Sequence, residues 1–137
     1  MIVLDASLVG PLTIPDEAGD IDPAAAGALL DGAIVVPVHW RLEIANMLRS
    51  AVRRGRLSAD QRDEALFRLA ALPVTMDRAG WDFAWSATIE LADRHDLTPY
   101  DAAYLEVARR RGATLATRDR ALIKAAHAER ISVTELR

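Results

Sequence analysis

Apolar and polar positions follow two patterns along the chain, short continuous apolar runs and longer segments with helical spacing. The runs are short enough to be strands and are bounded by polar residues, glycine or proline. They cover residues 2–4, 33–36, 74–76, 113–116 and 131–133. Helical patterns separate them almost throughout. Such alternation predicts a three-layer α/β sandwich with a mainly parallel central sheet, whose ligand site lies beyond the carboxyl ends of the strands.

Helix boundaries carry signals of their own. Asp22 followed by Pro23 is typical of an N-cap with a first-turn proline, and Ser58 with Gln61 forms a capping box. Together with apolar residues at helical spacing, such signals predict helices over 23–32, 42–55, 58–72, 81–92 and 98–111. A further short helix is expected between the last two strands.

Length and composition restrict the class of protein. The chain has 137 residues, half of them apolar, which predicts a single domain over 1–137 that buries roughly two-thirds of its unfolded surface. Without cysteine, disulfides and thiolate metal sites are excluded. No apolar run approaches the roughly 20 residues of a membrane span, so we expect a soluble, cytoplasmic protein. A net charge of −3 argues against binding nucleic acid through bulk positive potential, although local basic clusters remain possible.

Four carboxylates occupy positions that a parallel sheet brings to one edge. Asp5 ends the first strand and Asp119 follows the strand at 113–116, while Glu43 and Asp101 stand near the starts of their helices. Crowded carboxylates raise one another's pKa unless a cation lies between them. Ligation by oxygen alone favours Mg²⁺ or Mn²⁺ over zinc. Such an ion can activate water for attack on a phosphodiester, so the acids indicate nuclease chemistry.

Each acid also has a structural interpretation. Asp5 and Asp119 suit helix N-caps, and Asp101 in a first helical turn complements the helix dipole. Glu43 stands four residues after His39, which we interpret as a surface ion pair because zinc-binding helices carry two histidines at that spacing. Capping does not explain why all four acids coincide.

Other side chains leave alternatives open. A ribonuclease that uses the 2′-hydroxyl needs two converging histidines, and neither His95 nor His127 shows a partner pattern. Arginines at 49–56 and 109–111 could contact phosphates, but basic residues at helix ends more often complement the dipole. The tryptophans Trp40, Trp81 and Trp85 fit a core or subunit interface better than a base-stacking platform.

Four segments together resemble the motifs of a known family. They are Val3-Leu4-Asp5-Ala6-Ser7, Glu43-Ile44-Ala45-Asn46-Met47-Leu48, Tyr100-Asp101-Ala102-Ala103-Tyr104-Leu105 and Ala116-Thr117-Arg118-Asp119-Arg120-Ala121-Leu122. In order and spacing they are similar to the motifs of PIN domains, and of VapC toxins in particular. The resemblance spans nearly the whole chain.

This resemblance implies a Mg²⁺- or Mn²⁺-dependent endoribonuclease of a toxin–antitoxin pair, inhibited by a VapB-like antitoxin and expected to be a homodimer. Asp5, Glu43, Asp101 and Asp119 would be its metal-binding and catalytic residues. Ser7 and Thr117 would support the site by hydrogen bonding. Arg118 and Arg120 flank Asp119, where some relatives carry a further acid; they are candidate RNA contacts and leave the number of metals open. Products would carry a 5′-phosphate and a 3′-hydroxyl.

Two other classes remain as alternatives. A response-regulator receiver has similar size and an acidic Mg²⁺ pocket, and Asp77 follows an apolar run as a phosphoacceptor would. However, Asp5 stands alone where receivers carry an acid pair, and Lys124 follows a helical start rather than a strand. The second alternative is a PIN-fold binding protein that does not cleave RNA.

Overall fold

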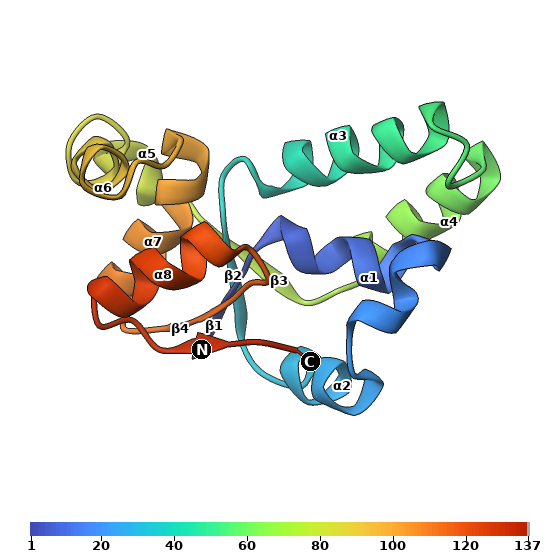
Figure 1. Ribbon diagram of the computed structural model, residues 1–137, viewed down its shortest axis with the longest axis horizontal. Coiled ribbons are helices and arrows are strands. Elements are labelled where there is room, and N and C mark those ends of the chain that lie inside the picture. The colour runs from blue at the N-terminus through green and yellow to red at the C-terminus, as the bar shows by residue number, and fades with distance from the viewer. Residues whose placement is uncertain (137) are drawn as a thin grey trace.

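The computed structural model describes residues 1–136, and its centre is a five-stranded sheet (Figure 1). The strands are β1 (Ile2–Leu4), β2 (Ile34–Pro37), β3 (Val74–Asp77), β4 (Thr114–Ala116) and β5 (Val133–Thr134). They lie in the order β3-β2-β1-β4-β5, and all four pairings are parallel. In the middle strand, Ile2 stands opposite Ile34 on one side and Thr114 on the other.

Helices cover both faces of the sheet. The first group consists of η1 (Ala6–Leu8), α1 (Val9–Thr13), η2 (Pro15–Asp20), α2 (Pro23–Leu30), α3 (Trp40–Arg53) and α4 (Ala59–Ala70). The second consists of α5 (Gly80–Phe83), α6 (Ala87–His95), α7 (Pro99–Arg111) and α8 (Arg120–Ala128). The chain first adds β2 and β3 on one side of β1, and then crosses back to add β4 and β5 on the other side. Right-handed crossovers in these two opposite directions place the two groups of helices on opposite faces of the sheet, as Figure 1 shows. The predicted three-layer α/β sandwich is confirmed.

Local signals set most helix boundaries as predicted. Asp22 accepts hydrogen bonds from the first turn of α2, and Ser58 and Gln61 form both bonds of the capping box at α4. Thr98 Oγ1 accepts from Asp101 N at the start of α7. Gly112 ends α7 at φ +62°, a conformation that glycine adopts without strain.

Two segments differ from the prediction. Residues 6–20 form the short turns η1, α1 and η2, which carry no helical periodicity because Gly10, Pro11 and Pro15 interrupt them. The helix predicted over 81–92 is two helices, because the backbone of Ser86 (φ −126°, ψ −96°) leaves the helical region.

The tryptophans do not share one environment. Trp40 is buried in the core as predicted, whereas Trp81 and Trp85 are 76% and 92% exposed, so a core role for these two is wrong.

The core lies on both sides of β1. Leu4, Leu105 and Leu115 are fully buried, and α7 packs across β1, β2 and β4. This packing brings the buried ring of Tyr104 beneath the end of β1, where its hydroxyl accepts a hydrogen bond from Ala6 N. Within residues 1–136, no helix combines the length and apolar character needed to cross a membrane.

Candidate functional site

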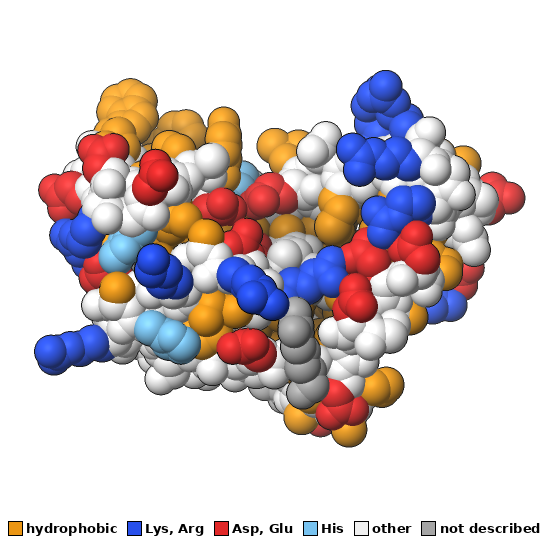
Figure 2. Space-filling view, in the orientation of Figure 1, with side chains coloured by type: hydrophobic (Ala, Val, Ile, Leu, Met, Phe, Trp, Pro, Cys, Tyr) orange, Lys and Arg blue, Asp and Glu red, His pale blue; other side chains and the backbone are white. Residues whose placement is uncertain are grey.

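The strand order changes direction between β1 and β4, and in open α/β sheets ligands bind at such a switch point beyond the carboxyl ends of the strands. Asp5 directly follows β1, and its backbone N–H donates to Ala116 O at 2.9 Å. Thr117 to Asp119 follow β4. Figure 2 shows the surface hollowed between the α5–α6 lobe and α3, with acidic side chains gathered in the hollow.

Asp5 is held by two hydroxyls from opposite ends of the chain. Thr117 Oγ1 donates to Asp5 Oδ2 at 2.6 Å, and Ser7 Oγ donates to the same oxygen at 2.7 Å. Both hydroxyls in turn accept backbone N–H groups, Thr117 from Asp119 and Ser7 from Arg118. These bonds fix the orientation of the carboxylate. Asp5 occupies the N-cap position of η1, as that interpretation predicted, but its side chain makes no capping hydrogen bond and bonds the two hydroxyls instead.

The hydrogen bonds do not fully compensate the buried charge of Asp5. The residue is 4% exposed, and burial raises the pKa of its carboxyl, with a further contribution from the charge of Glu43. The hydroxyl bonds act in the opposite direction but do not outweigh burial. A buried carboxylate of this kind becomes more favourable next to a cation.

A hydrogen bond from Tyr104 holds the carboxylate of Glu43 near Asp5. The hydroxyl of Tyr104 donates to Glu43 Oε1 at 2.8 Å, and burial, together with the charges of Asp5 and Glu43, raises the pKa of this tyrosine. In the sequence, only the position of Tyr104 three residues after Asp101, on the same face of α7, points to a role at the site. Tyr104 is a site residue that the sequence analysis did not predict.

His39 lies at the rim of this arrangement. Its Nε2 is 2.8 Å from Glu43 Oε1, but the angles are not those of a hydrogen bond. Its ring stacks edge-on against Tyr104 at 5.5 Å between centroids. The side chains of His39 and Glu43 are only 15% and 32% exposed, so the expected surface pair is instead a half-buried pair beside the acids.

Asp101 and Asp119 complete the group. Burial raises the pKa of Asp101, and the negative charges of Asp119 and Glu43 raise it further, so these three acids act on one another. Asp119 Oδ1 accepts from Leu122 N at 2.9 Å. Asp119 is therefore the predicted N-cap of α8 while also standing beside the other acids.

The donor set suits a hard cation, because these side chains offer only oxygen ligands and their charges repel one another. As they stand, however, no three histidine or acidic side chains within residues 1–136 lie close enough together to hold an ion. The residues fit Mg²⁺ or Mn²⁺ in chemistry, and ligation requires the side chains to rotate toward a common point. The metal stays a prediction.

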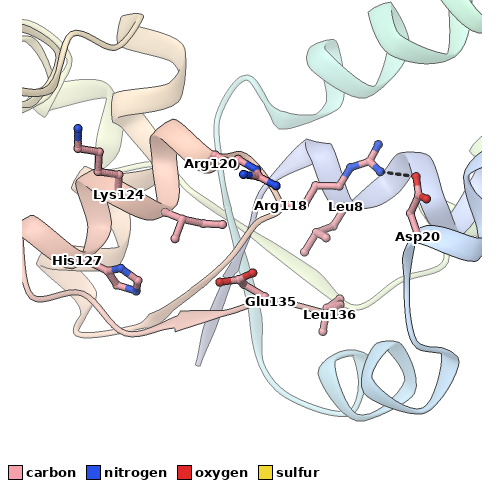
Figure 3. Close-up of a pocket in the computed structure, with 9 residues that line it drawn as sticks. Leu8, Asp20, Arg118, Arg120, Lys124, His127, Glu135 and Leu136 are labelled. Carbon is pink, nitrogen blue, oxygen red and sulfur yellow. Dashed lines mark hydrogen bonds and ion pairs between the residues drawn. The ribbon is translucent and has the colours of Figure 1, made fainter.

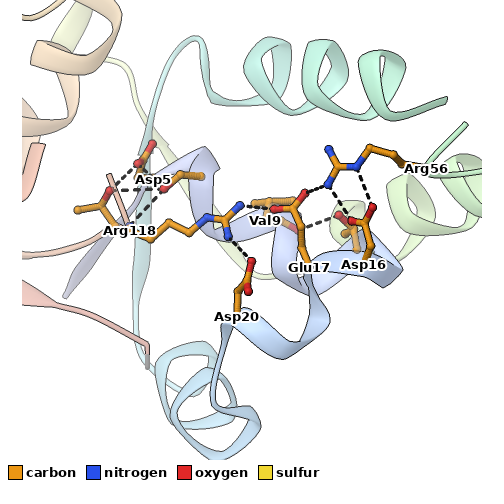
Figure 4. Close-up of polar contacts among 10 residues, drawn as sticks. Asp5, Val9, Asp16, Glu17, Asp20, Arg56 and Arg118 are labelled. Carbon is orange, nitrogen blue, oxygen red and sulfur yellow. Dashed lines mark hydrogen bonds and ion pairs between the residues drawn. The ribbon is translucent and has the colours of Figure 1, made fainter. Parts of the chain in front are cut away.

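Arg118 is held beside the site by acids of η2. It pairs with Glu17 and with Asp20, the latter at 3.1 Å (Figure 4). Glu17 also accepts from Arg56 at 2.7 Å, which links the end of α3 to the loop after β4. The other flanking residue, Arg120, is exposed at the start of α8.

The second arginine cluster is structural. Asp77 is fully buried at the end of β3 and pairs with Arg110 and, at 2.7 Å, with Arg111, while Glu106 pairs with Arg110 at 2.6 Å. A phosphate-binding role for Arg110 and Arg111 is therefore wrong, and so is simple solvation. His95 contacts Glu129 at 2.8 Å rather than another histidine, which gives no support to the two-histidine mechanism.

These observations also exclude the receiver alternative. A receiver has the strand order 2-1-3-4-5, whereas this sheet has 3-2-1-4-5. Asp77, the residue that could be mistaken for a phosphoacceptor, has no exposed surface and is neutralised by arginine.

Comparison with known proteins agrees with the fold. The model of the PIN domain family matches residues 2–128, and the chain belongs to this family. It is 30% identical over 121 residues to Ribonuclease VapC3 of Pyrobaculum aerophilum, covering 88% of this chain and 91% of the relative.

Solved structures share the fold at low sequence identity. PAE2754 from Pyrobaculum aerophilum has a TM-score of 0.70 at 22% identity, covering 98% of this chain and 83% of that one. VapBC2 from Rickettsia felis, bound to a DNA fragment from its promoter, has a TM-score of 0.68 at 13% identity, with both chains fully covered. FitAcB from Neisseria gonorrhoeae has a TM-score of 0.62 at 17% identity, covering 97% and 96%.

Proposed function

We propose that this chain is a metal-dependent endoribonuclease and the toxin of a toxin–antitoxin pair. One observation carries the proposal: the switch point of a PIN-fold sheet holds Asp5, buried and hydroxyl-bonded, within the field of further acids from α3 and α7. The relative named as a ribonuclease supports RNA as the substrate.

In this proposal Asp5, Glu43, Asp101 and Asp119 hold Mg²⁺ or Mn²⁺. When bound, the ion would polarise an attacking water and stabilise charge on the leaving oxygen of the phosphodiester. Ser7 and Thr117 keep Asp5 in one orientation, and Tyr104 holds Glu43 facing it. These hydrogen bonds restrain Asp5 and Glu43 before substrate arrives, so fewer side chains have to reorient when the ion binds.

We further propose a VapB-like antitoxin as the protein partner. The support is that VapBC2, one of the structural neighbours, is a named pair of this kind. Assembly as a homodimer and a cytoplasmic location stay predictions.

The test is cleavage of total cellular RNA by the purified chain without antitoxin, in Mg²⁺, in Mn²⁺ and with chelator. We expect cleavage that requires the metal and disappears in Asp5→Asn and in Asp101→Asn, because each change removes a ligand charge and little volume. Fragments should carry 5′-phosphates. Folded wild-type protein that leaves RNA intact under all conditions would instead favour the non-catalytic binding protein, and cleavage retained by both variants would overturn the site.

A further inference from the structure

A cavity of about 390 Å³ lies along α8, next to the acidic site. Figure 3 shows the charged residues that line it, which come from the loop after β4, from α8, from η2 and from the end of the chain beyond β5. They are Arg118, Arg120, Lys124, His127, Asp20 and Glu135. Asp119, the first residue before α8, separates Arg118 from Arg120, so the cavity begins where the acidic site ends.

The basic residues of α8 form one face of the helix. Arg120, Lys124 and His127 are spaced by four and three residues, which places them on the same side. Leu122, Ala125 and Ala126 face the core. A helix rises 1.5 Å per residue, so the basic face extends about 10 Å away from Asp119.

The two fully charged groups on this face have no internal counterion. Arg118 is neutralised by Glu17 and Asp20. Within residues 1–136, by contrast, neither Arg120 nor Lys124 lies within ion-pair distance of an acid. Their charges are therefore available to a ligand.

We propose that this cavity, the α8 groove, binds the phosphodiester backbone of the RNA next to the bond that is cleaved. This inference rests on the proposed function, and it specifies where the RNA strand would lie on the protein surface. A polyanion must approach several carboxylates on a chain of net charge −3. Arg120 and Lys124 would supply local attraction at the edge of the acidic site, and His127 would line the far end of the path. Contacts of this kind position the strand without reading its sequence.

Binding of a fluorescein-labelled single-stranded RNA, measured by anisotropy over a series of salt concentrations, tests the α8 groove. All proteins carry Asp5→Asn so that the RNA stays intact. We expect Arg120→Ala/Lys124→Ala to raise Kd about tenfold at moderate salt, and to reduce the slope of log K against log[salt] by about 1.4, since each lost contact to a single strand accounts for about 0.7. Lys124→Arg should restore the binding lost with Lys124→Ala.

A matched control removes two positive charges from another helix. Arg62→Ala/Arg68→Ala on α4 makes the same change in net charge, and both arginines are paired with neighbouring acids. This variant should bind RNA like its parent. Equal weakening by both double variants would indicate a general charge effect and overturn the α8 groove.

Lys124 provides a second readout because it is the only lysine. Mass spectrometry can follow acetylation of Lys124 with the amine of Met1 as internal reference. Bound RNA should slow labelling of Lys124 more than that of Met1, and equal rates would contradict the proposal.

The outcomes separate the groove from the proposed function. If wild-type protein cleaves RNA while the α8 variants keep Kd, slope and labelling unchanged, the groove is wrong and the nuclease stands. If wild-type protein neither binds nor cleaves RNA, both fall. If the α8 variants lose binding of an acidic peptide but not of RNA, the groove belongs to a protein partner.

Discussion

At the scale of single residues, the site depends on carboxylates whose charged form is disfavoured by burial and by neighbouring negative charges. Asp5 has two hydroxyl donors and is still destabilised in its charged form, because burial and Glu43 outweigh them. Burial and the negative charges of Asp119 and Glu43 likewise destabilise the charged form of Asp101. The consequence is a local cost to folding that a bound cation would relieve.

Asp5→Asn should therefore raise the stability of the metal-free protein at neutral pH. The pKa of Asp5 is higher in the folded than in the unfolded state, so its ionisation opposes folding fully above the folded value and not at all below the unfolded value. Asparagine removes this penalty and can still accept both hydroxyls. Urea unfolding with chelator should show a higher free energy of unfolding for the variant at pH 7, and a gap that narrows as the pH falls toward about 4. A variant less stable than wild type at pH 7 would contradict this.

Tyr104→Phe tests whether the tyrosine hydroxyl positions Glu43. The ring stays in place, but Glu43 loses the 2.8 Å hydrogen bond and Ala6 N–H loses its longer one to the same hydroxyl. We expect kcat to fall about tenfold or more with little change in KM, because a hydrogen bond to a charged group contributes about 1.5–3 kcal/mol. Weaker Mn²⁺ binding, followed by electron paramagnetic resonance, is a readout that a purely structural role would not change. Tyr100→Phe is the matched control, since Tyr100 lies one turn earlier on α7 and is 65% exposed.

At the scale of elements, ion pairs fasten the ends of helices to the sheet. The end of α7 is joined to the end of β3 by Asp77, which bonds Arg110, Arg111 and the backbone of Gly80. Arg110 also lies over the ring of Phe83 at 5.0 Å. Since α7 carries Asp101 and Tyr104 at its other end, this fastening helps to fix the position of the site.

Asp77→Asn should destabilise the protein by about 3 kcal/mol, because two arginines lose their buried partner. Burial alone would raise the pKa of Asp77, but the hydrogen bonds from Arg110 and Arg111 lower it overall. Its stabilising contribution is therefore present above the unfolded pKa and lost as the pH falls through the lowered folded value. Urea unfolding at pH 7 measures the effect. Asp82→Asn, at an exposed position on the adjacent α5, should be close to neutral. Similar losses in the two variants would exclude a special role for the buried network.

At the scale of the whole molecule, acids from four separate elements meet above one switch point. Asp5 follows β1, Glu43 lies on α3, Asp101 on α7 and Asp119 before α8. A cation bound there would join both helical layers across the sheet. Metal binding should thus stabilise the entire fold rather than one loop.

Mg²⁺ or Mn²⁺ should raise the Tm of the wild-type chain in a concentration-dependent way, and chelator should reverse the shift. Binding to the folded state alone stabilises it by about 2.7 kcal/mol at a hundredfold excess over Kd. Differential scanning fluorimetry across a metal titration measures the shift. Asp5→Asn should show little response, and KCl at the same ionic strength separates specific binding from screening. An equal rise of Tm in wild type and variant would argue against this site.

Features that depend on residues close together in the chain could be predicted from the sequence alone. Caps at Asp22, Ser58 and Thr98 join residues two or three positions apart, so propensity and spacing predict them. Alternating strands and helices predicted the parallel sheet, and the parallel sheet predicted that Asp5 and Asp119 emerge together. The four acids could thus be proposed as a group before their surroundings were known.

The contacts of each of these side chains depend on tertiary packing and could not be predicted from the sequence. The bond from Tyr104 to Glu43 spans 61 positions and that from Thr117 to Asp5 spans 112, so no local pattern reports them. The same holds for Asp77, whose two arginines lie 33 and 34 positions away in the chain. Local spacing fixes which way a side chain points along its own element. The packing of elements distant in sequence fixes what it meets there, and at this site it sets the burial and the charges that perturb Asp5 and Asp101.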